Sequence, residues 1–236
     1  MIKLCTVAEI RAAERAALSG GRTENDLMSA AAAGIASLIF KRSGDRVGTA
    51  LFLVGPGNNG GDGLVAATIL VEVGWTCYVW GYKRDDVGNA PVSDLAAERL
   101  NWIREPSELR EVLARADLIV DAVFGIGGKT SLPKEVAQAF AWAHEVRIAH
   151  GTPLWAVDLP SGVDADTGEA ADSAFRADMT VSIGLPKIGL YRAPALRFAG
   201  EIELVDIGLP APEATAADVA LIDEASVRAL LPRRRQ

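Results

Sequence analysis

The stretch that most constrains this chain is a glycine-rich segment between two apolar runs. It reads Val54-Gly-Pro-Gly-Asn-Asn-Gly-Gly-Asp-Gly63, with apolar residues at 50–54 before it and at 64–70 after it. This order predicts a strand, a loop and a helix. Five glycines would let the loop take up positive φ and approach a ligand, and the first N–H groups of the helix would point toward that loop. The segment is therefore typical of a site for a phosphate-bearing ligand.

The polar residues of this segment point to a second kind of ligand. Asn58, Asn59 and Asp62 add carbonyl and carboxylate oxygens, where a pure phosphate cradle would supply amides, Lys or Ser/Thr. Oxygen ligands of this kind suit a hard cation. The same segment thus predicts a cation beside the phosphate-bearing ligand.

Two general nucleotide motifs match only in part. Gly55, Gly57 and Gly60 satisfy the dinucleotide fingerprint G-x-G-x-x-G, but the apolar run at 75–80 leads into Gly-Tyr-Lys-Arg, and Asp85 comes late for the acidic residue expected there. By itself this match is weak.

The second partial match lies at residues 125–130, which end in Gly-Lys-Thr as a P-loop does. Val123 stands where the leading glycine of that motif belongs, so the P-loop interpretation is rejected.

Composition limits the class of protein. The chain has 236 residues, half of them hydrophobic, which is enough for one compact domain spanning 1–236. No window reaches the ~18 to 20 apolar residues of a membrane span, and the N-terminus lacks a signal-peptide pattern. Two cysteines far apart in the sequence favour buried thiols in a reducing cytoplasm. The net charge of −7 argues against a surface that binds nucleic acid. We therefore expect a cytoplasmic protein that binds neither membrane nor nucleic acid.

Helical and strand patterns alternate along most of the chain. Helices are predicted at 6–18, 26–44, 63–72, 107–115 and 133–147, with a further helix ending at 100, and strands at 50–54, 75–80, 117–124, 153–158, 179–183 and 202–206. This rhythm predicts an α/β fold with a mostly parallel sheet covered on both faces. The last two strands lack a long predicted helix between them, so we expect antiparallel strands at one edge as an open alternative.

Three polar loops follow predicted strands, at 55–63, 121–131 and 158–164. In an open α/β sheet, ligands bind outside the carboxyl ends of the strands. The side chains that would meet there are Asn58, Asn59, Asp62, Asp121, Asp158 and Ser161. Each alone could simply cap a turn, but all six at strand ends favour a functional site.

Four motifs together resemble one known family. They are residues 54–63, Asp121-Ala-Val-Phe-Gly-Ile-Gly127, Val157-Asp-Leu-Pro-Ser-Gly162 and Leu185-Pro-Lys-Ile-Gly-Leu190. Their order and spacing resemble those of the NAD(P)H-hydrate epimerases, the YjeF N-terminal domain family, over nearly the whole chain.

The resemblance implies a Rossmann-like three-layer α/β/α sandwich that repairs nicotinamide cofactors. The family interconverts the R and S forms of hydrated NADH and NADPH, so that an S-specific dehydratase can restore the cofactor. Carried over by motif position, Asn59, Asp121 and Ser161 would bind a potassium ion. The substrate would contact Asn58, Asn59, Gly60, Gly61, Asp62, Gly125, Ile126, Gly127, Gly128, Lys129, Thr130, Ser131 and Asp158.

Inverting C6 of the hydrate requires proton transfer, whether the hydroxyl leaves and returns through an iminium or the ring opens and closes at C6–N1. Asp158 is the candidate general acid/base, and the alternative is that it only hydrogen-bonds the substrate. Lys187 is a second catalytic candidate, which could reach a phosphate or tune Asp158. The alternative for Lys187 is a solvated loop lysine.

The end of the chain and two other functions remain open at this stage. Many bacterial members continue into a dehydratase domain through a linker that residues 230–236 resemble, so the dehydratase would be a fused domain or a separate metabolic partner. The family also suggests a homodimer. One competing function is a non-catalytic nucleotide-binding or protein-interaction module. The other is an NAD-dependent dehydrogenase, which is disfavoured because Asp85 comes late for the acidic residue of the dinucleotide fingerprint.

Overall fold

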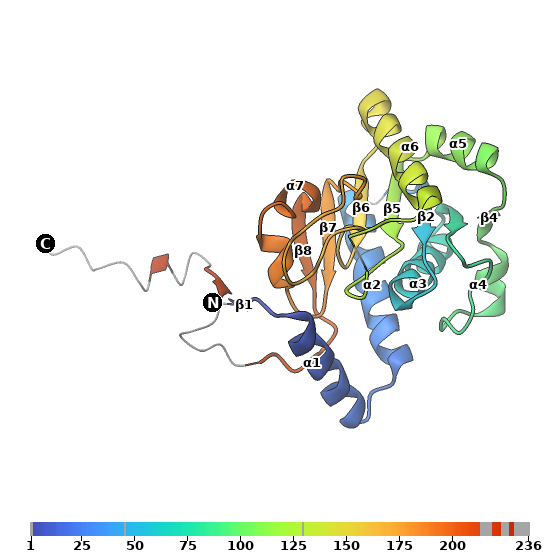
Figure 1. The fold of residues 1–236 in the computed structure, drawn as a ribbon. Helices are drawn as coiled ribbons and strands as arrows, with labels where there is room; N and C mark the ends of the chain where they lie inside the picture. Colours follow the sequence, from blue (N-terminus) through green and yellow to red (C-terminus); the bar gives the residue numbers. More distant parts are fainter. Residues whose placement is uncertain (1, 45, 129, 213–218, 223–226, 229–236) are drawn as a thin grey trace, which may run out of the picture.

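The protein is built around a seven-stranded sheet, seen in the computed structural model in Figure 1. The structure describes residues 2–44, 46–128, 130–212, 219–222 and 227–228. In spatial order the strands are β4 (Asn101–Ile103), β3 (Thr76–Gly81), β2 (Thr49–Val54), β5 (Leu118–Ala122), β6 (Leu154–Val157), β7 (Met179–Ile183) and β8 (Glu201–Val205). All neighbouring strands of this sheet are parallel.

The alternative of antiparallel strands at the edge of this sheet was therefore wrong. β8 runs parallel to β7, in register from Met179 opposite Glu201 to Ile183 opposite Val205. A parallel pair needs a crossover of about a dozen residues or more. Residues 184–200 supply it with the short helices η1 (Ile188–Tyr191) and α7 (Leu196–Ala199), which no long apolar pattern predicted. An antiparallel pairing does occur outside this sheet, between β1 (Ile2–Lys3) and β9 (Ala220–Leu221).

Helices cover both faces of the sheet, as the predicted three-layer sandwich requires (Figure 1). Their bounds are α1 (Val7–Ser19), α2 (Glu24–Arg42), α3 (Asn58–Glu72), α4 (Asp94–Glu98), α5 (Pro106–Arg115) and α6 (Lys134–His150). α1, α2 and α3 pack with one face of the sheet, and α5 and α6 with the other. Within the described ranges, none of these helices combines the length and apolar character needed to cross a membrane.

Side chains of β2 show how the two faces are filled. Ala50 and Phe52 join the core under α2 and α3, whereas Leu51 and Leu53 join the core under α5 and α6. Successive strand residues point to opposite faces, so a strand covered on both sides must be apolar throughout. The uninterrupted apolar run at this strand reflects that double burial.

The glycine-rich segment is helical earlier than expected. α3 begins at Asn58 rather than at residue 63, so most of the predicted loop forms the first turns of a helix. The glycines of residues 55–63 do not have positive φ. A Cβ on Gly60 would lie 2.0 Å from the Gly55 carbonyl oxygen, and one on Gly63 would lie 2.6 Å from Ala122 Cβ. Glycine is required here for close packing of the helix rather than for its backbone freedom.

The strand order reverses between β2 and β5. From β2 the chain moves outward through β3 to β4, and it then crosses back to continue through β5, β6, β7 and β8. A crevice forms outside the carboxyl ends of the strands at such a switch point, and ligands bind there. The connections that follow β2, β5 and β6 are those predicted to carry the functional residues.

Candidate active site

A cavity of about 430 Å³ opens at this switch point. Many of the predicted site residues line it: Asn58, Asn59, Asp62, Gly125, Ile126, Gly127, Gly128, Asp158 and Lys187. The three polar connections thus meet, as predicted from their places at strand ends. Other predicted contacts are not part of its wall: Gly60, Gly61, Thr130 and Ser131. Lys129 and residues 230–236 lie outside the described residues.

Gly61 illustrates why a residue of the motif can lie off the cavity. A Cβ at this position would lie 2.6 Å from the Met28 methyl carbon, because α3 packs directly against α2. Its contribution in this structure is helix packing, and its predicted contact with substrate stays a prediction.

Asp158 and Lys187 form a buried pair at the inner end of the cavity. The Lys187 side chain is 1% exposed, its Nζ contacts Asp158 Oδ1, and it donates a hydrogen bond to the Ile183 carbonyl oxygen. The interpretation of Lys187 as a solvated loop residue is therefore wrong. Removing a charge from water is expensive unless a partner compensates it, and Asp158 is that partner.

The backbone at Asp158 is held in an unusual conformation. Its φ is +69°, one of two positive values among the described non-glycine residues. Its N–H donates to the Val181 carbonyl oxygen at 2.8 Å, and Oδ1 accepts the Ile183 N–H at 3.4 Å. A residue kept in this region by its surroundings is a candidate functional residue. The second carboxylate oxygen, Oδ2, faces Gly125, where a Cβ would lie 3.3 Å away.

The N-terminal segment fixes the backbone around Lys187. Cys5 pairs with this segment like a neighbouring strand: its N–H donates to the Pro186 carbonyl oxygen at 2.8 Å, and its own carbonyl oxygen accepts the Ile188 N–H at 2.9 Å. Asp166 Oδ1 accepts the first helical N–H of α1, from Val7, at 2.7 Å. These contacts place α1 over the site.

Asp121 and Ser161 form a hydrogen-bonded pair beside the cavity. Ser161 donates to both carboxylate oxygens of Asp121, from Oγ and from its backbone N–H, each at 2.7 Å. Ser161 Oγ also accepts the Phe124 N–H at 2.8 Å. Burial raises the pKa of Asp121 to about 7, although these hydrogen bonds act in the opposite direction. A cation nearby would lower this pKa again, because it would stabilise the ionised form of the buried carboxyl group.

Asn59 lies close to that pair and lacks partners. The position of a Cβ on Gly125 is 3.2 Å from Asn59 Cβ, and Gly125 follows Phe124, which bonds Ser161. Asn59 Oδ1 and Nδ2 are both buried without a hydrogen-bond partner in the structure, a costly arrangement for an amide. An unpaired amide oxygen beside a serine hydroxyl and a buried carboxylate fits a hard cation. The described residues contain no group of three or more His, Cys, Asp or Glu side chains that could hold a metal, so such a cation would depend partly on neutral oxygens.

The structure adds wall residues that the sequence did not indicate. α1 contributes Ile10, Arg11 and Glu14, and the segment after β8 contributes Ile207 and Leu209. The helix predicted at 6–18 is present and opens with a capping box at Thr6, but the prediction did not indicate which face the helix turns to the site. No sequence signal identified these residues, because their position depends on how α1 packs.

Two further carboxyl groups share the cavity with Asp158. Burial, followed by the Asp158 charge, raises the pKa of Glu14 and raises the pKa of Asp62 well above its usual value. Lys187 acts in the opposite direction on both. The cavity therefore combines a compensated ion pair with carboxyl groups that resist ionisation.

A parallel sheet with a cavity at its switch point defines a Rossmann-like α/β protein with a candidate ligand-binding site. Residues 24–189 match the family described as YjeF-related protein N-terminus. The chain belongs to this family.

Named relatives agree with that assignment. The chain is 40% identical to the NAD(P)H-hydrate epimerase of Clavibacter sepedonicus, over 88% of this chain and 91% of that one. It is 34% identical to the Bifunctional NAD(P)H-hydrate repair enzyme Nnr of Thermofilum pendens, over 89% of this chain but only 41% of the relative. The corresponding enzyme of Dictyoglomus turgidum is 33% identical over 67% of this chain and 30% of its own length. The chain thus spans less than half of these two bifunctional relatives.

A solved structure supports the fold. The yeast protein ynu0, YNL200c, superposes with a TM-score of 0.67 over 92% of this chain and 98% of that one, at 20% identity.

Proposed function

We propose that this protein is an NAD(P)H-hydrate epimerase, an isomerase that interconverts the R and S hydrates of NADH and NADPH. The observation that carries the proposal is the buried Asp158–Lys187 pair at the inner end of a cavity located at the switch point of a dinucleotide-type sheet. Membership in the YjeF-related family and the names of its relatives support the same reaction.

Asp158 is the proton-transfer group in this proposal. Lys187 and the Ile183 N–H occupy Oδ1, so Oδ2, beside the open space at Gly125, is the oxygen available to substrate. By one route, Asp158 donates a proton to the C6 hydroxyl, the C6–O bond breaks to release water, and an iminium forms between N1 and C6. Water then adds to the opposite face and returns a proton to Asp158.

A ring-opening route uses the same residue. Asp158 takes the proton from the C6 hydroxyl, and the C6–N1 bond breaks with its electron pair passing to N1 and the conjugated carboxamide. The resulting aldehyde turns, and N1 then attacks its other face to form the bond again. The proton returns to the hydroxyl oxygen as the ring closes. In both routes Lys187 offers a compensating charge when Asp158 is ionised, and the buried site keeps the group aligned.

We also propose that Asn59, Asp121 and Ser161 bind a potassium ion. The unpaired amide oxygen of Asn59 and the buried Asp121 carboxylate support this assignment. A bound potassium ion would supply positive charge near the phosphate-bearing part of the substrate. The chain itself holds the connections after β5 and β6 together through the Ser161 hydrogen bonds.

Location and partners complete the proposal. Cys5 and Cys77 are both buried, and burial raises the pKa of the Cys77 thiol to about 12, which suits an unreactive thiol in a reducing cytoplasm. The longer bifunctional relatives support a dehydratase as metabolic partner or fused domain. A homodimer remains part of the proposal by family analogy.

The test is a time course of a purified S hydrate with potassium present, followed by NMR. We expect the wild type to produce the R form, and Asp158→Asn to slow this conversion by at least about 10²-fold, the contribution of a general acid/base. Asp172→Asn, an exposed aspartate later in the chain, is the control and should retain the wild-type rate.

Two outcomes would change the assignment. Equal rates for wild type and Asp158→Asn would remove proton transfer from Asp158. Conversion no faster than the spontaneous rate, with nucleotide still bound, would favour a non-catalytic binding module. Because Asp158→Asn leaves Lys187 buried without its partner, the double variant Asp158→Asn/Lys187→Met should be compared for thermal stability.

A further inference from the structure

Two basic residues follow the strand next to the glycine-rich segment. β3 ends at Gly81, and Lys83 and Arg84 come directly after Tyr82. Tyr82 donates its N–H to the Val54 carbonyl oxygen at 2.8 Å, which joins this turn to the end of β2. The basic pair, Lys83 and Arg84, therefore follows a residue that is hydrogen-bonded to the start of the glycine-rich segment.

Arg84 reaches the rim of the cavity. Its Nη2 donates to the carbonyl oxygens of Pro56 and Gly57, at 3.1 and 3.3 Å. Both of those residues line the cavity. The guanidinium is thus fixed against the outer side of the wall, and Gly57, to which it donates, directly precedes Asn58 at the start of α3.

The Arg84 charge is only partly compensated. Burial lowers the pKa of Arg84, and the Asp86 charge acts in the opposite direction without outweighing it. Nη1 is buried without a hydrogen-bond partner, and no ion pair within 4 Å joins Arg84 to an acidic side chain of the described residues. Fixing a partly compensated cation costs free energy that binding an anion would recover. Such an arginine is suited to a ligand phosphate.

Lys83 adds a second positive charge at the same turn. It is exposed, and its ammonium lies 5.4 Å from the centre of the Tyr82 ring. That ring packs edge-on against Phe124, another residue of the cavity wall, with centroids 5.8 Å apart. Lys83 therefore lies over a ring that packs against a residue of the cavity wall.

The topology indicates which part of a dinucleotide would meet this pair. Asp158 and Lys187 follow β6 and β7 and mark the reacting end of the cavity, on one side of the switch point. In sheets of this order the adenosine lies on the other side, at the end of the strand after the glycine helix, which is β3. An acidic residue there accepts the ribose 2′-hydroxyl, whereas arginine accommodates a 2′-phosphate.

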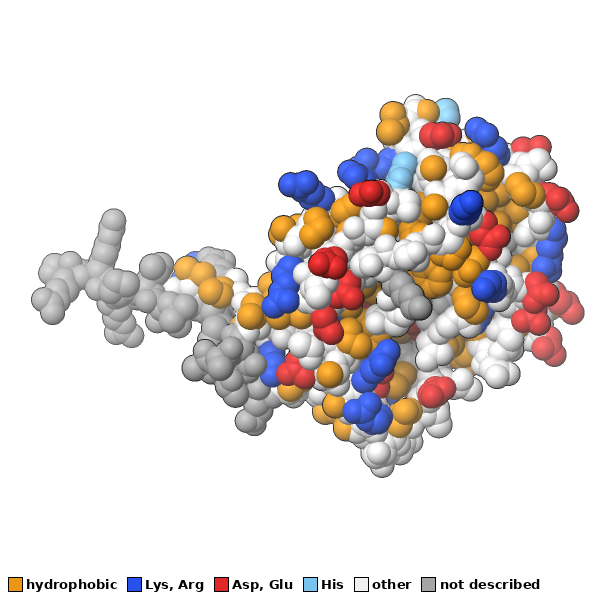
Figure 2. Space-filling view, viewed as in Figure 1, with side chains coloured by type: hydrophobic (Ala, Val, Ile, Leu, Met, Phe, Trp, Pro, Cys, Tyr) orange, Lys and Arg blue, Asp and Glu red, His pale blue; other side chains and the backbone are white. Residues whose placement is uncertain are grey.

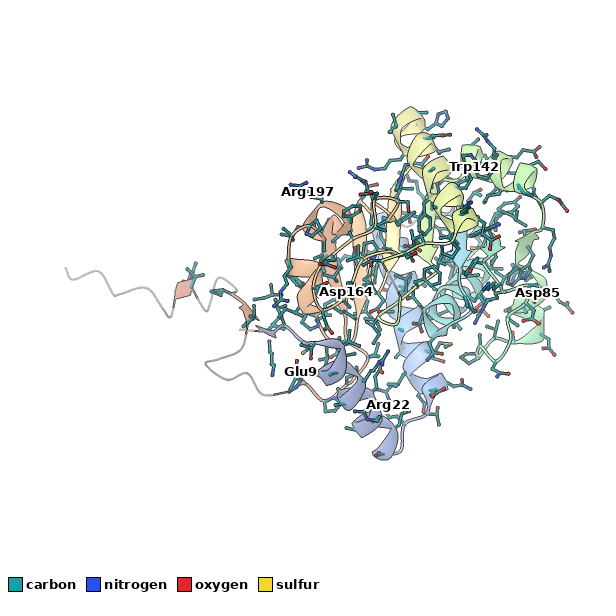
Figure 3. All side chains as sticks on the ribbon, viewed as in Figure 1. Glu9, Arg22, Asp85, Trp142, Asp164 and Arg197 are labelled. Carbon is teal, nitrogen blue, oxygen red and sulfur yellow. The ribbon has the colours of Figure 1, made fainter. Side chains whose placement is uncertain are left out.

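Asp85 comes after the basic pair and is late for the acidic role. Figure 3 shows it beside α4 at the outer edge of the molecule, far across the view from α1. Its carbonyl oxygen accepts Arg104 Nη2 at 2.9 Å, which ties this residue to the β4 side of the sheet.

We propose that Lys83 and Arg84 bind the 2′-phosphate of the adenosine ribose, so that this protein prefers the hydrate of NADPH to that of NADH. The preference for a reacting hydrate rests on the proposed function, but the binding of the 2′-phosphate can be measured without any reaction.

The first experiment is calorimetric titration of the full chain with adenosine 2′,5′-bisphosphate and with adenosine 5′-diphosphate. Both ligands carry two phosphates, and only the first has one at the 2′ position. We expect the wild type to bind the 2′,5′-bisphosphate about ten-fold more tightly, the lower end for a charge-assisted hydrogen bond. Lys83→Gln/Arg84→Gln should bind both ligands equally, because it lacks both positive charges. Glutamine at position 84 can still donate to the Pro56 and Gly57 carbonyl groups, so the turn should keep its structure.

A matched control removes the same charge elsewhere. Lys41→Gln/Arg197→Gln changes two basic residues at the opposite, amino-terminal edge of the sheet, before β2 and β8. This control should keep the wild-type preference. Equal affinities in the wild type, no binding of either nucleotide, or an equal loss for both ligands in Lys83→Gln/Arg84→Gln would each overturn the proposal.

The second experiment compares kcat/KM for the two hydrates. The ratio that favours NADPH hydrate should fall about ten-fold in Lys83→Gln/Arg84→Gln and remain unchanged in the control. A ratio unaffected by that variant overturns the proposal. If neither hydrate is epimerised but the wild type still prefers the 2′,5′-bisphosphate, the proposed function fails and the 2′-phosphate site stands.

Discussion

The His144 imidazole lies on α6 with its ring centroid 5.7 Å from that of Phe175, and its Nε2 accepts the Arg176 N–H at 2.9 Å. Burial, reinforced by the charges of Arg176 and Arg147, lowers the pKa of His144 to about 4. An unfolded histidine takes up its proton near pH 6.5. The stability that neutral His144 contributes is thus present above about pH 6.5 and is lost as the pH falls toward 4.

This difference predicts a measurable pH dependence. Between pH 7 and pH 4.5, the free energy of unfolding should fall by about 1–2 kcal/mol more in the wild type than in His144→Gln, allowing for solvent screening of a half-buried group. Urea unfolding at both pH values measures it. His150→Gln, at the exposed end of α6, should behave as the wild type, and a His144→Gln protein with the wild-type pH dependence would contradict the prediction.

The first turns of α3 depend on glycine at some positions and tolerate a side chain at others. A Cβ on Gly60 would lie 2.0 Å from the Gly55 carbonyl oxygen, which belongs to rigid backbone, whereas a Cβ on Gly57 meets nothing within 4 Å. Gly60→Ala should therefore lower the free energy of unfolding by at least about 2 kcal/mol, and Gly57→Ala should stay within about 1 kcal/mol of the wild type. Chemical denaturation of the pair tests this, and equal stabilities would show that the helix start can shift.

α1 is the element that completes the site from outside the matched family region of residues 24–189. Asp166 and the Cys5 pairing fix it at its amino end, and Arg22 donates to the Ile207 carbonyl oxygen beyond its other end. Figure 3 shows Arg22 at the far end of α1 from Glu9. These contacts hold Ile207, after β8, close to the helix that forms the other part of the same wall.

Potassium binding would couple the site to the stability of the whole molecule. A ligand that binds only the folded state stabilises it by about 2.7 kcal/mol at one hundred times its Kd. We therefore expect potassium chloride to raise Tm by about 5–10 °C relative to tetramethylammonium chloride at the same ionic strength.

The adjacent asparagines provide the matched pair for this measurement. Asn59, whose amide is buried without partners, should be required, so Asn59→Ala should lose the potassium-dependent rise in Tm. Asn58 is exposed at the start of α3, so Asn58→Ala should keep it. A rise that persists in Asn59→Ala would exclude this residue as a ligand.

At the scale of the molecular surface, the face drawn in Figure 2 carries charges of both signs. Basic and acidic side chains are interspersed on this face, with no continuous basic stripe among the described residues. This distribution accompanies the net charge of −7 and suits a small anionic ligand captured by a few local groups, such as the backbone N–H groups of α3 and the basic pair after β3.

The sequence by itself determined the parallel α/β class and the meeting of the polar connections. Apolar runs buried on both faces and regular helices between them leave few other arrangements, and strand ends in such a sheet lie along one edge. Asp158, Asp121 and Asn59 could be assigned to one site for that reason.

Only the tertiary structure decided what depends on packing between distant segments. The parallel direction of β8, the helical start at Asn58, the burial of Lys187 and the approach of α1 to the site each result from such contacts. Local sequence patterns report on neighbours a few residues apart. They carry no information on the Cβ contacts, ion pairs and hydrogen bonds that join residues separated by more than a hundred positions, as Asp166 and Val7 are.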